Sequence, residues 1–171
     1  AKVAKAGMKA GADLINDIWG LKADPKMAEV IAKHQVACCL MHNRASVDYT
    51  DFLADVMQDL QETIDIAKKA GISDAKIILD PGVGFAKNYE QNLEVLGNLR
   101  RFHALGYPVL LGSSRKSVIG LTLDLPSEER LEGTLVTTVA AVEQSVSFVR
   151  VHDIKENARA INMAQAIYRR K

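Results

Sequence analysis

The sequence has only two cysteines, and they are adjacent: Cys38 and Cys39 lie inside an apolar run. Neighbouring cysteines make a poor disulfide pair, and no second Cys or His set with metal-ligand spacing lies near them. We therefore expect both to be ordinary strand residues, outside any disulfide framework or zinc site.

Other signals are also absent. No apolar run approaches the ~20 residues that a membrane-spanning helix needs, and no secretory signal is visible. The formal net charge is only +1, so we expect no general attraction to nucleic acid or to an anionic membrane. The hydrophobic content of 48% and the length of 171 residues are typical of one globular domain. Together these features predict a cytoplasmic protein.

The start of the chain is unusual. The first residue is Ala1, and residues 1–11 have the pattern of the end of a helix, with Gly11 suited to its exit. We therefore expect this chain to be a fragment.

Strand-like and helix-like segments alternate along the sequence. The expected strands span residues 13–18, 36–41, 76–79, 108–112 and 148–152, and the expected helices span 1–11, 25–34, 51–70, 89–105, 128–144 and 154–168. Leu93, Leu96 and Leu99 are expected on the inner face of the fourth helix. Short strands rich in Val, Ile and Leu, joined by helices, predict a parallel sheet covered by helices.

Two α/β architectures fit this alternation. An open, flavodoxin-like sheet needs about five strands, whereas a (β/α)8 TIM barrel needs eight. Polar side chains lie at or just beyond the ends of all five expected strands: Asn16, His42, Asp80, Lys116, Arg150 and His152. A barrel mouth gathers every strand end around one site, so this distribution favours the barrel. Residues 1–171 would then form a single domain, the last five βα units of such a barrel.

The most informative segments follow the last two expected strands. In Val149-Arg150-Val151-His152-Asp153, alternation along a strand would put the cationic side chains on one face and the valines on the other. Ser113-Ser114-Arg115-Lys116-Ser117 adds more positive charge after the preceding strand. Two cationic clusters at neighbouring strand ends predict a site for a phosphorylated or diphosphorylated substrate.

The third strand is followed by Asp80-Pro81-Gly82-Val83-Gly84-Phe85-Ala86-Lys87, which is neither a Walker A loop nor a dinucleotide fingerprint. Two interpretations of Asp80 are open: it caps its own turn, or it faces an N–H-rich heterocycle. Asn16 has the same ambiguity between capping and reading a ring edge. Met41 suits a soft apolar wall, while His42 alone is weak evidence for a metal site.

Together these segments resemble dihydropteroate synthase. The resemblance rests on residues 11–17, 40–42, 77–85, 112–117 and 149–153, which occur in the family's order and spacing; the Met-His-Asn-Arg wording is similar to the Firmicute branch. It implies a (β/α)8 barrel and a transferase of folate biosynthesis. That enzyme joins 6-hydroxymethyl-7,8-dihydropterin diphosphate to p-aminobenzoate and releases diphosphate. Sulfonamides compete with p-aminobenzoate, and the family forms homodimers.

The resemblance also implies roles for individual residues. Asn16 and Asp80 would hydrogen-bond the pterin, Lys116 would reach its polar edge, and Met41 would line its slot. Arg150 would pack by the ring and bind phosphate, and His152 would bind phosphate. Phe85 and Ser117, with Lys116, would border p-aminobenzoate. Asp80, Lys116 and Arg150 are the implied catalytic residues of a dissociative cleavage, in which the arylamine captures a cationic pterin methylene.

In that family magnesium assists the reaction, and its protein ligand lies in the first three βα units, which this sequence lacks. No metal ligand is therefore expected in this chain, and the fragment itself is expected to be inactive. Two alternatives stay open beside the flavodoxin-like domain. One is a pterin domain that transfers methyl from methyltetrahydrofolate to a corrinoid, and the other is a non-catalytic pterin-binding or dimerisation remnant.

Overall fold

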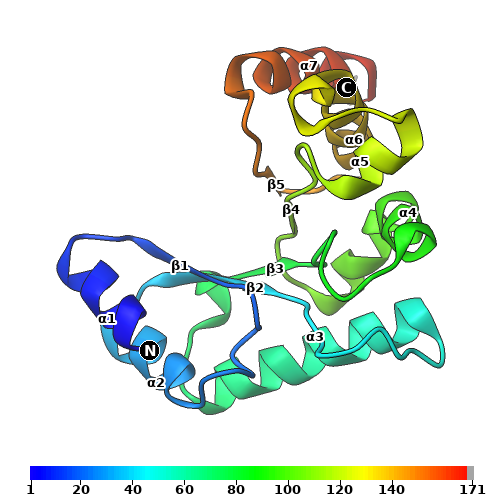
Figure 1. Cartoon of the computed structure of the whole chain (residues 1–171). Helices are drawn as coiled ribbons and strands as arrows, with labels where there is room; N and C mark the ends of the chain where they lie inside the picture. Colours follow the sequence, from blue (N-terminus) through cyan, green and yellow to red (C-terminus); the bar gives the residue numbers. More distant parts are fainter. Residues whose placement is uncertain (169–171) are drawn as a thin grey trace.

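The computed structural model describes residues 1–168, and its strands form one curved row (Figure 1). The strands are β1 (Leu14–Asp17), β2 (Ala37–Met41), β3 (Ile77–Asp80), β4 (Leu110–Leu111) and β5 (Phe148–Val149). β1, β2 and β3 pair in parallel in that order, and β4 pairs in parallel with β5. A parallel bridge between Leu79 and Val109 links β3 to the segment that leads into β4.

The strands are thus parallel and adjacent in chain order, as the barrel interpretation predicts. A flavodoxin-like sheet would change direction at a switch point within the row. The observed order has no such point among the described strands, so the flavodoxin-like alternative is wrong.

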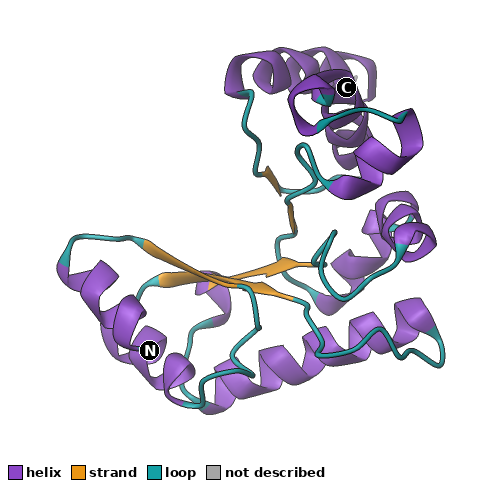
Figure 2. Cartoon of the chain, in the orientation of Figure 1, coloured by secondary structure: helices purple, strands orange, loops and turns teal. Residues whose placement is uncertain are grey.

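Helices line the outer side of this row of strands (Figure 2). They are α1 (Lys2–Lys9), α2 (Lys26–His34), α3 (Phe52–Lys69), α4 (Tyr89–Gly97), α5 (Ser117–Leu123), α6 (Leu131–Glu143) and α7 (Ile154–Tyr168). Short 3-10 helices span Asp74–Lys76, Leu99–Leu105 and Ser127–Glu129. Within residues 1–168, no helix is both long enough and apolar enough to cross a membrane.

Side-chain capping fixes the start of two helices. The Asp51 carboxylate accepts the N–H of Ala54 at 3.3 Å and begins α3. Asn88 and Gln91 form a reciprocal capping box at the start of α4. Both devices satisfy N–H groups that have no partner inside the helix.

The strands have two chemically different faces. Ile15, Cys38, Leu40, Ile77 and Leu79 point toward the helices and belong to, or pack against, the apolar core. Because parallel partners share a face, the strand register places the alternate residues Asn16, Cys39, Met41, Ile78 and Asp80 together on the opposite, inner face. The inner face therefore carries the polar strand-end side chains. Both cysteines are free and buried, as expected, and burial raises the pKa of each thiol to about 12.

Three sequence-based expectations need correction. The expected helix 89–105 is broken at Asn98, and Leu93 is 41% exposed, so it does not lie on an inner face. The expected helix 128–144 begins only at Leu131, after a 3-10 turn. Helix α5, directly after the Ser-Arg-Lys segment, was not expected, because its seven residues are too few for a clear periodic pattern.

Candidate functional site

Asp80 is the central residue of the site. It ends β3 on the inner face, where only 5% of it is exposed, and Met41 is its register partner on β2. Its carboxylate accepts the N–H of Gly82 at 2.8 Å, so the turn-capping interpretation is confirmed. The same carboxyl group lies on the inner face of the strands. Capping the turn and facing an N–H-rich heterocycle are therefore compatible interpretations of Asp80.

Cations approach Asp80 from several elements. Burial raises the pKa of the Asp80 carboxyl, whereas the Gly82 N–H and the charges of Lys116, Arg150 and Lys87 act to lower it. Gly112, directly after β4, lies between Arg150 and Asp80. A Cβ atom there would lie 3.6 Å from the Arg150 guanidinium and 3.8 Å from the Asp80 Oδ2. Arg150 and Asp80 therefore flank the same point of the backbone.

Lys116 bridges the exits of two strands. We call residues 81–87 the β3 exit loop; the Lys116 ammonium donates to the Val83 carbonyl of this loop and lies 4.8 Å from the centroid of the Phe85 ring. Gly84 makes room for the lysine, since a Cβ atom there would lie 3.0 Å from Lys116 Cδ. Burial lowers the pKa of Lys116 below its usual value, and the nearby Asp80 carboxylate offsets only part of this effect. The lysine is thus a partly desolvated cation beside an aromatic wall.

Two cross-links join the segments that follow β4 and β5. The Ser114 hydroxyl lies 2.9 Å from His152 Nδ1, and its oxygen also accepts the His152 backbone N–H at 3.2 Å. Arg115 donates twice to Asp153, at 3.1 and 2.6 Å. When Ser114 donates to Nδ1, the neutral imidazole carries its proton on Nε2, which then becomes a donor for an incoming anion. These cross-links bring the two predicted cationic segments side by side.

One part of the anion-site prediction is wrong in its geometry. β5 ends at Val149, so Arg150 and His152 do not project from one face of a strand. The ladder stops because its partner β4 also ends early, at Leu111, where Gly112 leads into the exit turn. The Arg150 N–H still donates to the Leu111 carbonyl at 2.9 Å, which keeps Arg150 against the end of β4.

The structure therefore brings most of the predicted residues into one region. Asp80, Lys116, Phe85 and Arg150 are linked by the contacts above, and Met41 lies beside Asp80. Asn16 lies on the same inner face but is exposed, two strands away from β3. Ser117 is exposed and is the first residue of α5, directly after Lys116. His152 is held at the β4 and β5 exits by Ser114.

Sequence reasoning did not predict the buried contacts of His42 with Asp59 and Lys87. His42 is 2% exposed, its Nε2 lies 2.9 Å from Asp59, and its Nδ1 lies 2.8 Å from the Lys87 ammonium. Burial, with the charge of Lys87, lowers the pKa of His42 to about 3. The only sequence signal was that His42 and Lys87 each follow a strand, which does not reveal that they meet.

The residues present do not fit a magnesium site. Within the part of the chain that the structure describes, no group of three or more His, Cys, Asp or Glu side chains could hold a metal ion. Asp153 is bound by Arg115, and Asp80 is surrounded by cations.

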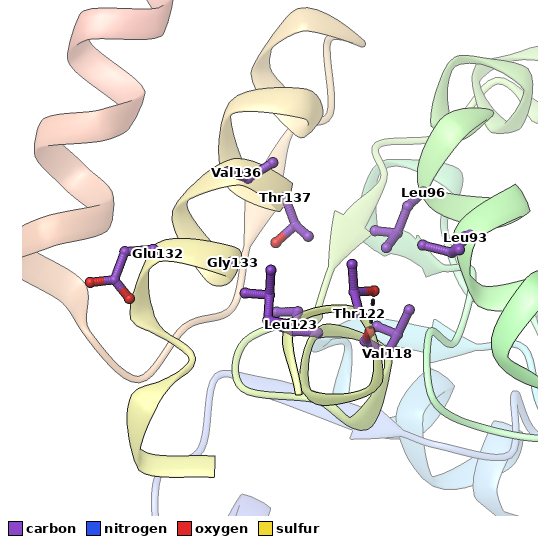
Figure 3. Close-up of a pocket in the computed structure, with 10 residues that line it drawn as sticks. Leu93, Leu96, Val118, Thr122, Leu123, Glu132, Gly133, Val136 and Thr137 are labelled. Atoms are coloured by element: carbon purple, nitrogen blue, oxygen red, sulfur yellow. Dashed lines mark hydrogen bonds between the residues drawn. The ribbon is translucent and has the colours of Figure 1, made fainter. Parts of the chain in front are cut away.

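A separate apolar groove of about 280 Å3 lies between α4, α5 and α6 (Figure 3). Leu93, Leu96, Val118, Leu123 and Val136 supply most of its apolar walls. The exposure of Leu93 is explained by this groove. None of the predicted site residues lines it, so it is not part of the strand-end site.

Comparison with known proteins shows which family the sequence resembles. The family described as pterin binding enzyme matches residues 1–152. Dihydropteroate synthases from Clostridium beijerinckii and Bacillus subtilis are 58% and 53% identical, over 99% and 98% of this chain. These relatives confirm the predicted resemblance to the Firmicute branch. The chain spans 64% and 59% of their respective lengths.

A solved structure shows the same fold. The crystal structure of dihydropteroate synthase from Clostridium difficile in the presence of pteroic acid superposes with a TM-score of 0.96 and 46% identity. The match covers 99% of this chain and 65% of that one. The five parallel βα units are accordingly part of a (β/α)8 barrel, as predicted. On its sequence and its fold, this chain belongs to the pterin-binding enzyme family.

Proposed function

We propose that this chain supplies the pterin- and diphosphate-binding part of a dihydropteroate synthase, the transferase that joins 6-hydroxymethyl-7,8-dihydropterin diphosphate to p-aminobenzoate. The observation that carries the proposal is the position of Asp80 on the inner face, with Arg150 on the other side of Gly112 and Lys116 bound to the β3 exit loop. A buried carboxylate suits the N–H edge of a pterin, and fixed cations suit its diphosphate. The chain would form the C-terminal part of the barrel.

Each group has a chemical task in this proposal. Asp80 accepts hydrogen bonds from the pterin and favours positive charge on the ring as the bond to diphosphate breaks. Arg150 neutralises the charge that builds on the leaving diphosphate oxygens, and the His152 Nε2–H stabilises this charge by a hydrogen bond. Lys116 binds the polar edge of the pterin, and Met41 forms an apolar wall. Asn16 binds the ring from β1, and Phe85 and Ser117 border the p-aminobenzoate.

The wider features of the enzyme are part of the same proposal. The chain spans 64% of the Clostridium beijerinckii synthase, so the complete reaction is proposed only for a whole protein of that kind. Such a protein would be a cytoplasmic homodimer that uses magnesium and is inhibited by sulfonamides. The magnesium ligands would come from outside residues 1–168.

A methyl-transferring pterin domain is the nearest competing function, and it predicts different ligands. Its substrate, methyltetrahydrofolate, carries no diphosphate, so the cations around Asp80 would have no purpose there. Calorimetric titration of the chain with pterin diphosphate and with methyltetrahydrofolate separates the two. We expect binding of the diphosphate ligand; binding of methyltetrahydrofolate alone would show that the proposed function is wrong.

A further inference from the structure

Lys87, the last residue of the β3 exit loop, makes three hydrogen bonds, two within this loop and one to His42. Its ammonium donates to the Gly82 carbonyl at 3.1 Å, to the Phe85 carbonyl at 3.0 Å and to His42 Nδ1 at 2.8 Å. An ammonium has three protons, and here each proton has one acceptor. The side chain thus ties both ends of the turn 82–85 to the end of β2.

The third acceptor is available only in one tautomer of His42. Asp59, on α3, lies 2.9 Å from His42 Nε2 and accepts its N–H, which leaves the Nδ1 lone pair facing Lys87. Arg44 donates to the same Asp59 oxygen at 2.5 Å and keeps this carboxylate charged. Asp59 therefore sets the tautomer of His42, and His42 is the third hydrogen-bond acceptor of Lys87.

These contacts hold the part of the loop that carries Phe85. The Phe85 ring faces the Lys116 ammonium, and the Phe85 carbonyl is one of the three acceptors of Lys87. Asp80, in contrast, is fixed by β3 and by the Gly82 N–H, and does not hydrogen-bond to Lys87. The loop is also braced by Asn92, which accepts the Gly84 N–H at 2.6 Å. Loss of the Lys87 contacts should thus displace Phe85 more than Asp80.

We propose that Lys87 is a positioning residue, which fixes the backbone of the β3 exit loop so that Phe85 faces the arylamine that joins the pterin. Asp59 and His42 act through Lys87 by setting its third acceptor. This inference rests on the proposed function, because it assigns Phe85 to the arylamine side of the ligand. It predicts that Lys87 affects an arylamine-bearing ligand and leaves a bare pterin nearly untouched.

The protonation state of Lys87 sets the conditions of the test. Burial lowers the pKa of Lys87 to about 7, with Lys116 and Arg44 acting in the same direction and the carboxylates of Asp80 and Asp59 in the opposite one. Measurements at pH 6 keep the ammonium charged. At this pH the His42 imidazole is neutral, since its pKa is about 3.

The first experiment follows the loop without any ligand. Lys87→Met removes all three donors at nearly constant length, and Lys33→Met, on an exposed residue of α2, is the matched control. We expect hydrogen exchange at the Gly84 and Phe85 amides to accelerate about tenfold or more in Lys87→Met, the equivalent of one hydrogen bond with a charged donor. The amides of β3 and those of the control should keep the wild-type rates. Unchanged exchange at both loop amides would overturn the inference.

The second experiment compares two ligands. Pteroic acid contains a pterin joined to p-aminobenzoate, whereas 6-hydroxymethylpterin has the pterin alone. We expect Lys87→Met to weaken pteroic acid about tenfold and the bare pterin less than about twofold. Equal weakening of both, or of neither, would contradict a positioning role. If the wild-type chain bound neither ligand, the proposed function would fail, while the exchange rates would still decide whether Lys87 fixes the loop.

A milder variant keeps the test valid if Lys87→Met does not fold. Asp59→Asn leaves Lys87 in place but no longer imposes the Nε2–H tautomer on His42. Long-range 1H–15N spectra should show that tautomer in the wild type and a mixture in Asp59→Asn, with faster exchange at the Phe85 amide. A single unchanged tautomer with unchanged exchange in Asp59→Asn would contradict the proposed chain of contacts.

Discussion

The Arg115 guanidinium holds the Asp153 carboxylate with two hydrogen bonds, of 3.1 and 2.6 Å, across the segments that follow β4 and β5. Arg115 has a left-handed backbone (φ 57°), and Lys116 comes directly after it. The pair therefore joins the two cationic segments and holds an unfavourable backbone in place. Arg115 holds the pKa of Asp153 below its usual range through the same hydrogen bonds.

A change in this pair should affect the proposed anion site. We expect Asp153→Asn to weaken binding of the pterin diphosphate several-fold, because the neutral amide cannot bind the guanidinium as a charged pair. Arg115→Lys should have a similar effect, since lysine cannot make the two parallel hydrogen bonds. Calorimetric titration checks both variants. Wild-type affinity in both would show that the cross-link does not organise the site.

The β3 exit loop should depend strictly on Gly82. Its φ is +73°, and a Cβ atom there would lie 2.1 Å from the His42 carbonyl oxygen. We expect Gly82→Ala to lower the free energy of unfolding by about 3 kcal/mol or more, from the left-handed backbone and the steric clash together.

Gly71 provides the matched control for this prediction. It has a similar φ of +86° but no atom within 4 Å of a hypothetical Cβ. Gly71→Ala should lower the free energy of unfolding only through the left-handed backbone, by about 1–2 kcal/mol. Urea unfolding measures both variants, and equal losses would show that the contact with His42 is not tight.

The buried His42 should make stability depend on acid pH. Its pKa falls from 6.5 to about 3 on folding, so between these values the unfolded chain binds more protons than the folded one. Stability should therefore fall as the pH drops from 6.5 toward 3, with a slope of up to ~1.4 kcal/mol per pH unit from this group.

Two variants isolate this contribution. His42→Gln should reduce the slope of unfolding free energy against pH, and His34→Gln, on an exposed residue of α2, is the matched control. Denaturant unfolding at several pH values provides the measurement. The same slope in all three proteins would contradict the buried, neutral state of His42.

The sequence predicted the parallel strand order because short apolar strands alternated with helical segments that were long enough to be recognised. It located Asp80, Lys116 and Arg150 because each follows an apolar run. It could not predict the Lys87–His42 contact, which depends on how two loops fold back on each other. It also predicted too long a strand for β5, since a β-branched sequence favours a strand but cannot show where the partner strand ends.

The chain on its own should not complete the reaction. In the proposed function the described residues supply cations for diphosphate, and they form no cluster of metal ligands. Loss of one positioned electrostatic contact typically costs on the order of 10²–10³ in rate, so we expect no measurable dihydropteroate from pterin diphosphate and p-aminobenzoate. A coupled diphosphate-release assay, with full-length enzyme excluded by mass spectrometry, checks this. Steady product formation would show that these five strands suffice.

The most direct test of the central claim is the contribution of Arg150 to diphosphate recognition. Calorimetric titration should compare the wild type and Arg150→Ala with two ligands, the pterin diphosphate and the bare pterin alcohol. We predict that Arg150→Ala weakens the diphosphate ligand by about tenfold to a hundredfold, as expected for a charge-assisted contact, and barely changes the alcohol. Equal losses for the two ligands would contradict the claim that this strand-end site binds diphosphate.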